Sequence, residues 1–305
     1  MQHPSTIFPH RAVSNRSSIM VSMSNVLSTE RRAQVVSCLV EGMSIRATVR
    51  VTGVAKNTIV KLLADLGSVC ADYQDLALRN LDSRVIECDE IWSFCYAKQK
   101  NVPDQFRDTP GYGDVWTWVA IDADTKLVPS WFVGERTARD CYTFLSDLKS
   151  RLRNRVQLTT DGHKPYLMVV EPLFGADAID FAMLHKIYGP GSDDARRYSP
   201  ATCQGIDKRV ITGDPDDRRI STSYVERQNL TMRMGMRRFT RLTNGFSRKV
   251  ENLAHAVSLH YMHYNFCRTH STLTKRYGKP TTPAMAAGVA KYPWSVYELV
   301  GLLSN

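Results

Sequence analysis

The 305-residue sequence lacks any uninterrupted apolar run close to the roughly 18 residues that a membrane-spanning helix needs. Its seven cysteines are an odd number without a CxxC pair, which excludes a disulfide framework and a cysteine-rich zinc site. The first 29 residues contain no acid and no apolar core, so we interpret residues 1–25 as a disordered leader, or as the result of a start codon placed too early, since Met20 and Met23 follow closely, rather than as a secretory signal. These absences together predict reduced thiols in a cytoplasmic protein.

Acidic residues are also in short supply. Thirty Asp and Glu residues stand against 40 Lys and Arg, which leaves a formal charge of +10 and a pI near 9.3. This excess indicates a polyanionic partner, nucleic acid before an anionic membrane, although charge alone leaves open a basic protein without such a partner. We expect no membrane partner, because the basic stretches described below lack the exposed apolar face of a surface-bound helix.

Residues 26–70 are predicted to form a small all-α domain. Apolar spacing predicts three helices: Thr29 to Gly42, Ser44 through Arg50, and Ala55 to about Leu66. Gly53 lies between the second and third helices and would let them cross, as in a helix-turn-helix DNA-binding domain. The third helix would expose donors suited to phosphates and base edges, namely Lys56, Asn57, Thr58 and Lys61. The alternative is an ordinary three-helix bundle with a solvated basic face.

After a predicted linker over residues 71–82, residues 83–268 are predicted to form an α/β domain. Five segments rich in β-branched and aromatic residues are predicted strands: 84–94, 114–122, 126–133, 155–160 and 179–185. Amphipathic helices are predicted over 137–152 and 165–174. This order is typical of a ribonuclease H-like mixed five-stranded sheet with flanking helices, while an ordinary α+β domain is the alternative. Residues 189–220 are predicted to be an exposed irregular insertion, and residues 269–305 a tail packed on the core.

Two acids stand at the predicted strands that such a sheet makes neighbours. Asp89 lies within the first strand, and Asp161 closes the fourth before a glycine, so their carboxylates should converge. Carboxylate oxygens are hard ligands that suit Mg²⁺ or Mn²⁺ rather than zinc. Other acids compete for this role: Glu87, on the same strand face as Asp89, and Glu90, Asp114, Asp122 and Asp124. The last two fit the hairpin turn better.

A third acid, Glu226, opens a predicted helix. Ser223, three residues earlier, satisfies the capping-box pattern, which is the purely structural alternative for this glutamate. Asn229, Arg233 and Arg237 share its helical face, which suits metal binding beside a phosphodiester. The stretch from Arg227 to Lys249 contains seven basic residues and no acid, and therefore predicts a nucleic-acid track. Its predicted DNA-binding residues are Arg227, Arg233, Arg237, Arg238 and Arg241.

Six segments, in this order, resemble the insertion sequence one (IS-one) family of transposases: TGVAKNTIVKLL, CDEIWSF, TTDGHKPY, TSYVERQNL, HYMHYNF and TPAMAAG. The resemblance covers roughly residues 28–299. It implies a ribonuclease H-like core with a DDE carboxylate triad, which falls on Asp89, Asp161 and Glu226. Many members carry a cysteine-rich, zinc-finger-like segment ahead of the helix-turn-helix, and this chain has none. Recognition of element ends should therefore depend on the helix-turn-helix and the basic track.

The resulting hypothesis is metal-dependent cleavage and 3′-hydroxyl strand transfer of double-stranded DNA at the ends of an insertion sequence. Two Mg²⁺ or Mn²⁺ ions are expected, one held by Asp89 and Asp161 and the other by Asp89 and Glu226. The protein is expected to act as a homo-oligomer on DNA, in a prokaryotic cytoplasm. The alternatives are a ribonuclease H-like nuclease without strand transfer, and a DNA-binding regulator without catalysis.

Overall fold

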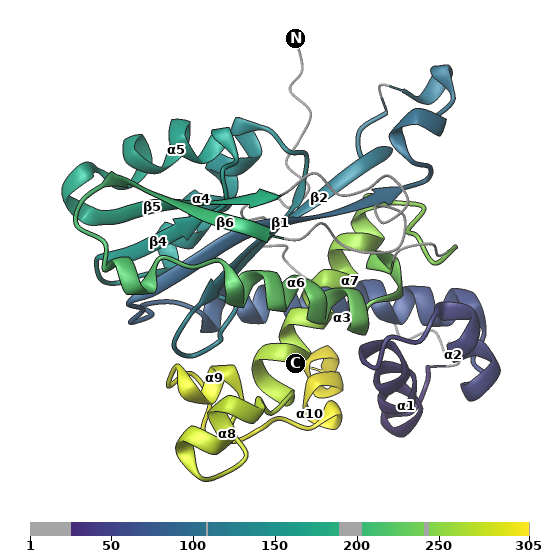
Figure 1. Ribbon diagram of the computed structural model, residues 1–305. Coiled ribbons are helices and arrows are strands. Elements are labelled where there is room, and N and C mark those ends of the chain that lie inside the picture. The colour runs from purple at the N-terminus through teal and green to yellow at the C-terminus, as the bar shows by residue number, and fades with distance from the viewer. Residues whose placement is uncertain (1–25, 108, 189–202, 241–243, 305) are drawn as a thin grey trace, which may run out of the picture.

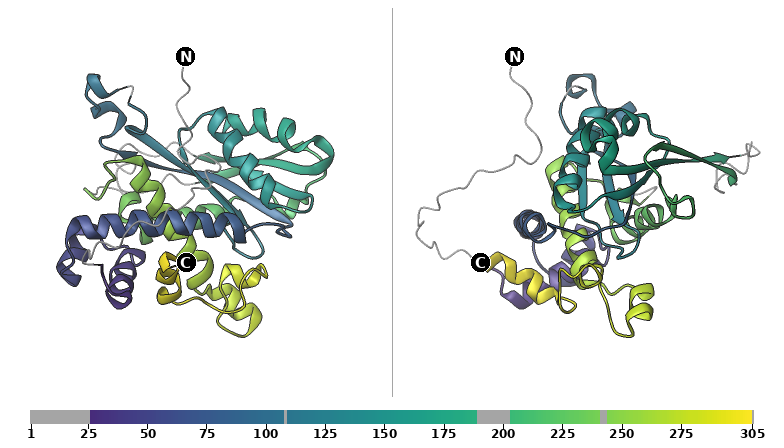
Figure 2. Two further views of the ribbon diagram at one scale, coloured as in Figure 1. Left: turned by 180° about the vertical axis from the view of Figure 1, so that it is seen from behind. Right: turned by 90° about the vertical axis from the view of Figure 1, so that its left-hand side faces the viewer.

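The computed structural model describes residues 26–107, 109–188, 203–240 and 244–304, so the predicted leader over residues 1–25 lies outside the described residues. The fold is mixed α/β, with a six-stranded sheet and helices on both of its faces (Figure 1; Figure 2). The strands are β1 (Val85–Cys95), β2 (Gly113–Asp122), β3 (Ser130–Gly134), β4 (Val156–Thr160), β5 (Ile179–Tyr188) and β6 (Cys203–Thr212). The helices are α1 (Thr29–Val40), α2 (Ile45–Thr52), α3 (Lys56–Ala77), α4 (Ala138–Arg151), α5 (Lys164–Phe174), α6 (Ser223–Gly235), α7 (Val250–Met262), α8 (Ser271–Tyr277), α9 (Pro283–Ala286) and α10 (Val296–Gly301).

The strands lie in the order β3-β2-β1-β4-β5-β6. β1 pairs in parallel with β4, which confirms the predicted proximity of the first and fourth strands, and it pairs antiparallel with β2. β5 is parallel to β4, whereas the edge strands β3 and β6 are antiparallel to their neighbours. All five residues of β4 are buried, as expected for a parallel strand covered by helices on both faces.

The prediction of a five-stranded sheet is wrong, because residues 203–212 form the sixth strand, β6, within the segment predicted to be irregular. β6 pairs only with β5 and leaves Ile206, Val210 and Ile211 exposed, so no alternation of buried and exposed residues marks it in the sequence. The predicted exposure of this segment is confirmed for residues 203–212, most of which are exposed. Residues 189–202 of the predicted insertion lie outside the described residues.

The predicted hairpin between the second and third strands is longer than expected, because β3 begins at Ser130 rather than at Lys126. Lys126 adopts a left-handed backbone conformation with φ of 62°. The buried Asn265 side chain accepts a hydrogen bond from the Val128 N–H at 3.0 Å and donates one to the Val128 carbonyl at 2.9 Å. This side chain therefore bonds both main-chain groups of Val128, as a neighbouring strand would.

Two apolar clusters pack on opposite faces of the sheet. One joins Ile86, Cys88 and Trp118 of the sheet to α4 and α5. The other joins Ile91, Val119 and Ile121 to residues of α6 and α7, and continues into α3 and α1. Consecutive β1 residues thus alternate between the two layers, as the strand period of two requires. Figure 2 shows α4 and α5 on one side of the sheet and α3, α6 and α7 on the other.

The three amino-terminal helices form where the sequence predicts them, and Gly53 ends α2 with φ of 68°. α3 is longer than predicted, since it runs without interruption through Gly67 to Ala77 and includes residues 71–77 of the predicted linker. Gly67 is the point of closest approach between α3 and α7, because a Cβ atom there would lie 2.5 Å from the His255 carbonyl oxygen. The Ser258 hydroxyl donates to the Gly67 carbonyl at 2.7 Å. The glycine therefore serves helix packing and does not end the helix.

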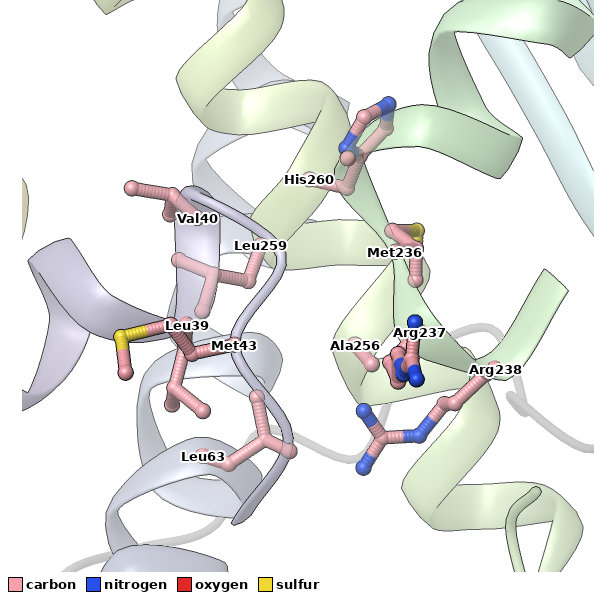
Figure 3. Close-up of a pocket in the computed structure, with 11 residues that line it drawn as sticks. Leu39, Val40, Met43, Leu63, Met236, Arg237, Arg238, Ala256, Leu259 and His260 are labelled. Carbon is pink, nitrogen blue, oxygen red and sulfur yellow. The ribbon is translucent and has the colours of Figure 1, made fainter. Parts of the chain in front are cut away.

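The amino-terminal helices also contact the rest of the chain at a second place (Figure 3). Apolar side chains of α1, α3 and α7 line a small cavity of about 20 Å³, and Arg237 and Arg238 border it. A Cβ atom on Gly42 would lie 3.2 Å from the Gly235 carbonyl oxygen at the end of α6.

α10 packs on α1, and Trp294 contacts the rings of Tyr73 and Phe266. Among the described helices, none is long and apolar enough to cross a membrane.

Gly67→Val is expected to lower the free energy of unfolding by about 1–3 kcal/mol, the usual cost of forcing extra methyl groups into a packed interface. The branched side chain would meet the His255 main chain, which cannot turn away as a flexible side chain could. Urea unfolding followed by circular dichroism measures the change. Asp72→Val, which places the same residue at an exposed position of α3, is the control and should change the free energy much less.

Candidate metal centre

The two acids predicted to converge do so at the carboxyl end of β4, beside the middle of β1. The last parallel pair joins Cys88 to Thr160, so Asp89 and Asp161 each follow the final paired residue of adjacent strands. Beyond this point β1 continues without β4 beside it, which leaves room for the two carboxylates. A carboxylate oxygen of Asp89, one of Asp161 and one of Glu90 all lie within 4.8 Å of one another. Glu90 is thus brought into the site, although the sequence marked it only as a competing acid.

Asp89 faces α6. One carboxylate oxygen accepts a hydrogen bond from the Asn229 side-chain nitrogen at 2.8 Å, and the other accepts from the Glu90 N–H at 2.8 Å. Burial, together with the nearby charges of Asp161 and Glu226, raises the pKa of Asp89 to about 6, although these two hydrogen bonds oppose the rise. The site therefore concentrates negative charge that only a cation or protons can relieve.

Glu90 lies on the opposite face of β1, and its side chain is completely buried. The Arg136 Nε atom donates to it at 3.0 Å, and another guanidinium nitrogen lies 3.7 Å from Asp161. The same guanidinium stacks over the Trp116 ring, with 4.6 Å between Cζ and the ring centroid. Burial, with the charge of Asp161, raises the pKa of Glu90 to about 7 despite Arg136. Arg136 thus links two carboxylates of the cluster from the loop after β3.

The third predicted acid, Glu226, lies on α6 and is not part of this cluster. Its carboxylate accepts hydrogen bonds from the Lys186 ammonium group on β5 and from the Thr222 hydroxyl, the latter at 2.7 Å. One turn further along α6, Asn229 contacts Asp89, so Glu226 stands beside the cluster. The capping-box alternative is wrong, because Thr222 rather than Ser223 precedes the helix and makes no side-chain cap.

Glu87 anchors the amino end of α6. Its Oε2 atom accepts hydrogen bonds from the backbone N–H groups of Tyr224 and Val225 at 2.7 and 3.0 Å. A strand carboxylate therefore satisfies the first amides of the helix, where the helix dipole also favours negative charge. Burial raises the pKa of Glu87 to about 7. The predicted competitor of Asp89 is thus a positioning residue that ties the helix of Glu226 to the strand of Asp89.

Glu87→Ala is expected to lower the free energy of unfolding by about 1–3 kcal/mol, since it leaves the Tyr224 and Val225 amides without their acceptor. Glu87→Gln keeps an acceptor oxygen and should cost much less, because a carboxyl group with a pKa near 7 is already partly neutral at neutral pH. Urea unfolding of both variants at neutral pH compares them. Equal losses would mean that the charge of Glu87, rather than its acceptor, holds α6.

The predicted DNA-binding residues are spread over two regions. Lys56, Asn57, Thr58 and Lys61 are exposed at the start of α3, where Lys61 also pairs with Asp65. On and after α6, Arg227 and Arg237 are exposed and Arg233 is half-buried. Arg238 is half-buried and donates from Nε to the Ser247 hydroxyl at 2.8 Å, and burial lowers its pKa to about 10. Arg241 lies outside the described residues.

The sequence did not single out Arg136, Lys186 or His163 as site residues. The His163 N–H donates to an Asp161 carboxylate oxygen at 3.0 Å and so fixes the turn after β4. A Cβ atom on Gly162 would lie 2.3 Å from the His185 ring, which explains why a glycine follows Asp161. Lys186 was missed because the predicted strand ended at residue 185, whereas β5 continues to Tyr188. Arg136 lies in the loop after β3, and no periodic pattern in the sequence relates this loop to the acids.

Comparison with known proteins finds a likeness among solved structures. No family model matches the chain, and no curated protein matches it. Among solved structures, the chain is similar to one in the crystal structure of the Mos1 strand transfer complex, with 12% sequence identity. The match covers 90% of this chain and 82% of that one, with a TM-score of 0.24. At that score the likeness carries no conclusion about activity, and the site is interpreted from its own geometry.

Proposed function

We propose that the protein is a ribonuclease H-like transposase of the DDE type, which cleaves double-stranded DNA at the ends of an insertion sequence and joins the freed 3′-hydroxyl to target DNA. The observation that carries the proposal is the convergence of Asp89 and Asp161 at the point where the parallel pairing of β1 with β4 ends. Glu226 stands beside them on a helix that Asp89 itself contacts through Asn229. This arrangement supports the DDE triad implied by the IS-one resemblance.

The donor atoms fit a hard divalent cation such as Mg²⁺ or Mn²⁺. They are carboxylate oxygens only, and those of Asp89, Glu90 and Asp161 converge within the described part of the chain. Asp89 and Asp161 would hold one ion, and Asp89 with Glu226 a second. When bound, such ions supply charge stabilisation for the phosphodiester and activate water at neutral pH. Glu90 is a further carboxylate within reach of the first ion.

The surrounding residues orient these acids. Asn229 fixes one Asp89 oxygen, the His163 amide fixes one Asp161 oxygen, and Glu87 holds the start of α6. Arg136 balances part of the negative charge, so that the acids can lie close together. Lys186 neutralises Glu226. Binding a cation at Glu226 would require the Lys186 ammonium group to move away from the carboxylate. The ammonium group could then pair with a DNA phosphate.

Binding to DNA is proposed to involve α2 and α3 as a helix-turn-helix. The exposed Lys56, Asn57, Thr58 and Lys61 would enter the major groove, where such donors read base edges and phosphates. The basic residues after Glu226, predicted to be Arg227, Arg233, Arg237, Arg238 and Arg241, would neutralise phosphates close to the metal centre. Assembly as a homo-oligomer on DNA and action in the cytoplasm remain predictions.

The test is an in vitro reaction of the full chain with a plasmid that carries the DNA flanking its coding region. Cleavage at defined ends in Mg²⁺ or Mn²⁺, joining of those ends to a second plasmid, and loss of both in EDTA are expected. Cleavage without joining would replace the proposal with a nuclease. Binding to the ends without cleavage in either metal would replace it with a regulator.

A further inference from the structure

A second cavity, of about 420 Å³, lies on the other side of α6 from the metal centre. Its walls come from α6, from the β2–β3 connection and from the segment between α7 and α8. The residues that matter for its chemistry are Lys126, Tyr224, Arg227, Arg268 and His270. Only Arg227 among them belongs to the predicted basic track.

The geometry of α6 explains why one helix serves two sites. With 3.6 residues per turn, Glu226, Asn229 and Arg233 lie along one flank, which faces the acids. Tyr224, Arg227 and Thr231 lie along the opposite flank and line the cavity. The buried residues Val225 and Met232 hold the helix on the sheet between the two flanks.

The cavity is strongly cationic. Three of its lining residues, Lys126, Arg227 and Arg268, carry positive charge, and no acid lines it among the described residues. Burial lowers the pKa of His270, and the charges of Lys126, Arg268 and Arg227, which line the same cavity, lower it further. The His270 Nδ1 atom is buried and has no hydrogen-bond partner in the described structure. An anion would relieve the repulsion and could meet the unsatisfied nitrogen.

The cationic wall is held in place before any ligand binds. The Lys126 ammonium group donates to the Ala123 carbonyl and lies 3.1 Å from the centroid of the Tyr224 ring. The Tyr264 hydroxyl donates to the Lys126 carbonyl at 3.0 Å, and Asn265 fixes Val128 as described above. These contacts hold both the left-handed backbone and the ammonium group of Lys126, so its positive charge stands at the cavity wall without further ordering of the side chain.

We propose that this cavity binds backbone phosphates of the DNA whose neighbouring segment occupies the metal centre. The inference rests on the proposed function and extends it to residues outside the triad and the basic track. Opposite sides of a helix are about 10–12 Å apart, and each DNA strand carries one charge per roughly 3.4 Å of axis. A strand that crosses α6 would therefore place a phosphate in the cavity roughly three or four nucleotides from the one at the metal centre.

The experiment measures binding of the full chain to fluorescein-labelled element-end DNA by anisotropy, in EDTA and over a series of salt concentrations. Arg268→Gln is expected to weaken binding about tenfold, the usual loss for one charged hydrogen bond, and to reduce the slope of log Kd against log salt by about 1. Arg268→Lys keeps the charge and should restore the slope. Arg153→Gln removes an exposed charge at the amino end of β4, far along the strand from Asp161, and is the control.

The outcomes separate the two proposals. If Arg268→Gln binds DNA with the same affinity and salt slope as Arg153→Gln, the cavity does not hold DNA phosphate and this inference is wrong. If inorganic phosphate binds the wild type but not Arg268→Gln, while Arg268→Gln keeps its DNA affinity, the cavity binds a free anion and the inference is again wrong. If DNA binding depends on Arg268 but the wild type never cleaves, the inference holds and the proposed catalytic function fails.

Discussion

Asp161→Asn is expected to lower the rate of DNA end cleavage by about 10³-fold or more, the order of loss seen when one member of an interdependent catalytic set is removed. Asparagine keeps the size of the side chain and can still accept the His163 amide, but it has no negative charge to hold a divalent cation. The measurement is single-turnover cleavage of labelled element-end DNA in Mg²⁺. Asp114→Asn, an exposed acid at the start of β2, is the matched control and should cleave normally.

Asp161→Asn should have a free energy of unfolding at least as large as that of the wild type in the absence of metal. Asp161 raises the pKa of both Asp89 and Glu90, which means that the three carboxylates repel one another in the folded protein. Removing one charge relieves that repulsion, as is common where function requires an arrangement that costs stability. A variant that loses cleavage and also unfolds more easily in EDTA would point to a structural role for Asp161 and would contradict the triad assignment.

The second large effect is a pH-dependent stabilisation by divalent cations. The pKa of Asp89 in the folded protein, about 6, lies above the value near 3.9 expected for an unfolded chain. The contribution of Asp89 to the free energy of unfolding is therefore fully present below about pH 4. This contribution, roughly 2–3 kcal/mol for a pKa shift of this size, is lost as the pH rises through 6. Glu90, with a pKa of about 7, adds a loss in the same direction.

Divalent cations bind the deprotonated carboxylates and reverse this loss. We expect Mg²⁺ to raise the melting temperature by several degrees at pH 8, since ligand at about 100 times its Kd contributes roughly 2.7 kcal/mol, and by clearly less at pH 6. Thermal unfolding in Mg²⁺ and in EDTA at the two pH values measures the difference. The stabilisation should disappear in Asp89→Asn. An undiminished effect in that variant would place the ion elsewhere on the protein.

The residues of the site that lie on strands or helices with a clear apolar pattern could be predicted from the sequence. The apolar, β-branched runs around Asp89 and before Asp161 define two strands, and the requirement for neighbouring parallel strands brings their ends together. Glu226 was selected through the helical face that it shares with Asn229, and that amide does contact Asp89, although Glu226 itself lies outside the cluster. Strand parity and helix period determine where a side chain points, which is why the positions of Asp89 and Asn229 could be predicted.

The remaining features depend on contacts between distant segments. β6 has no buried face, so its pairing with β5 leaves no trace in its residue pattern. Arg136 and Lys186 reach the acids from a loop and from the end of β5, and no local spacing encodes either contact. The third helix was predicted to end at about Leu66, whereas α3 continues through Gly67, which its packing on α7 requires to be a glycine.

The unbroken α3 would set the distance along the DNA between the recognised sequence and the cleaved bond. A helix of 22 residues forms a rod of about 33 Å, close to the roughly 34–36 Å that one turn of a B-form duplex occupies. The proposed reading residues stand at one end of this rod, and the other end is clamped to α7 beside the sheet. The number of base pairs between the recognised sequence and the cut would then be set by the length of α3. Inserting one residue into it would turn the reading end by about 100° around the rod and put recognition out of phase with cleavage.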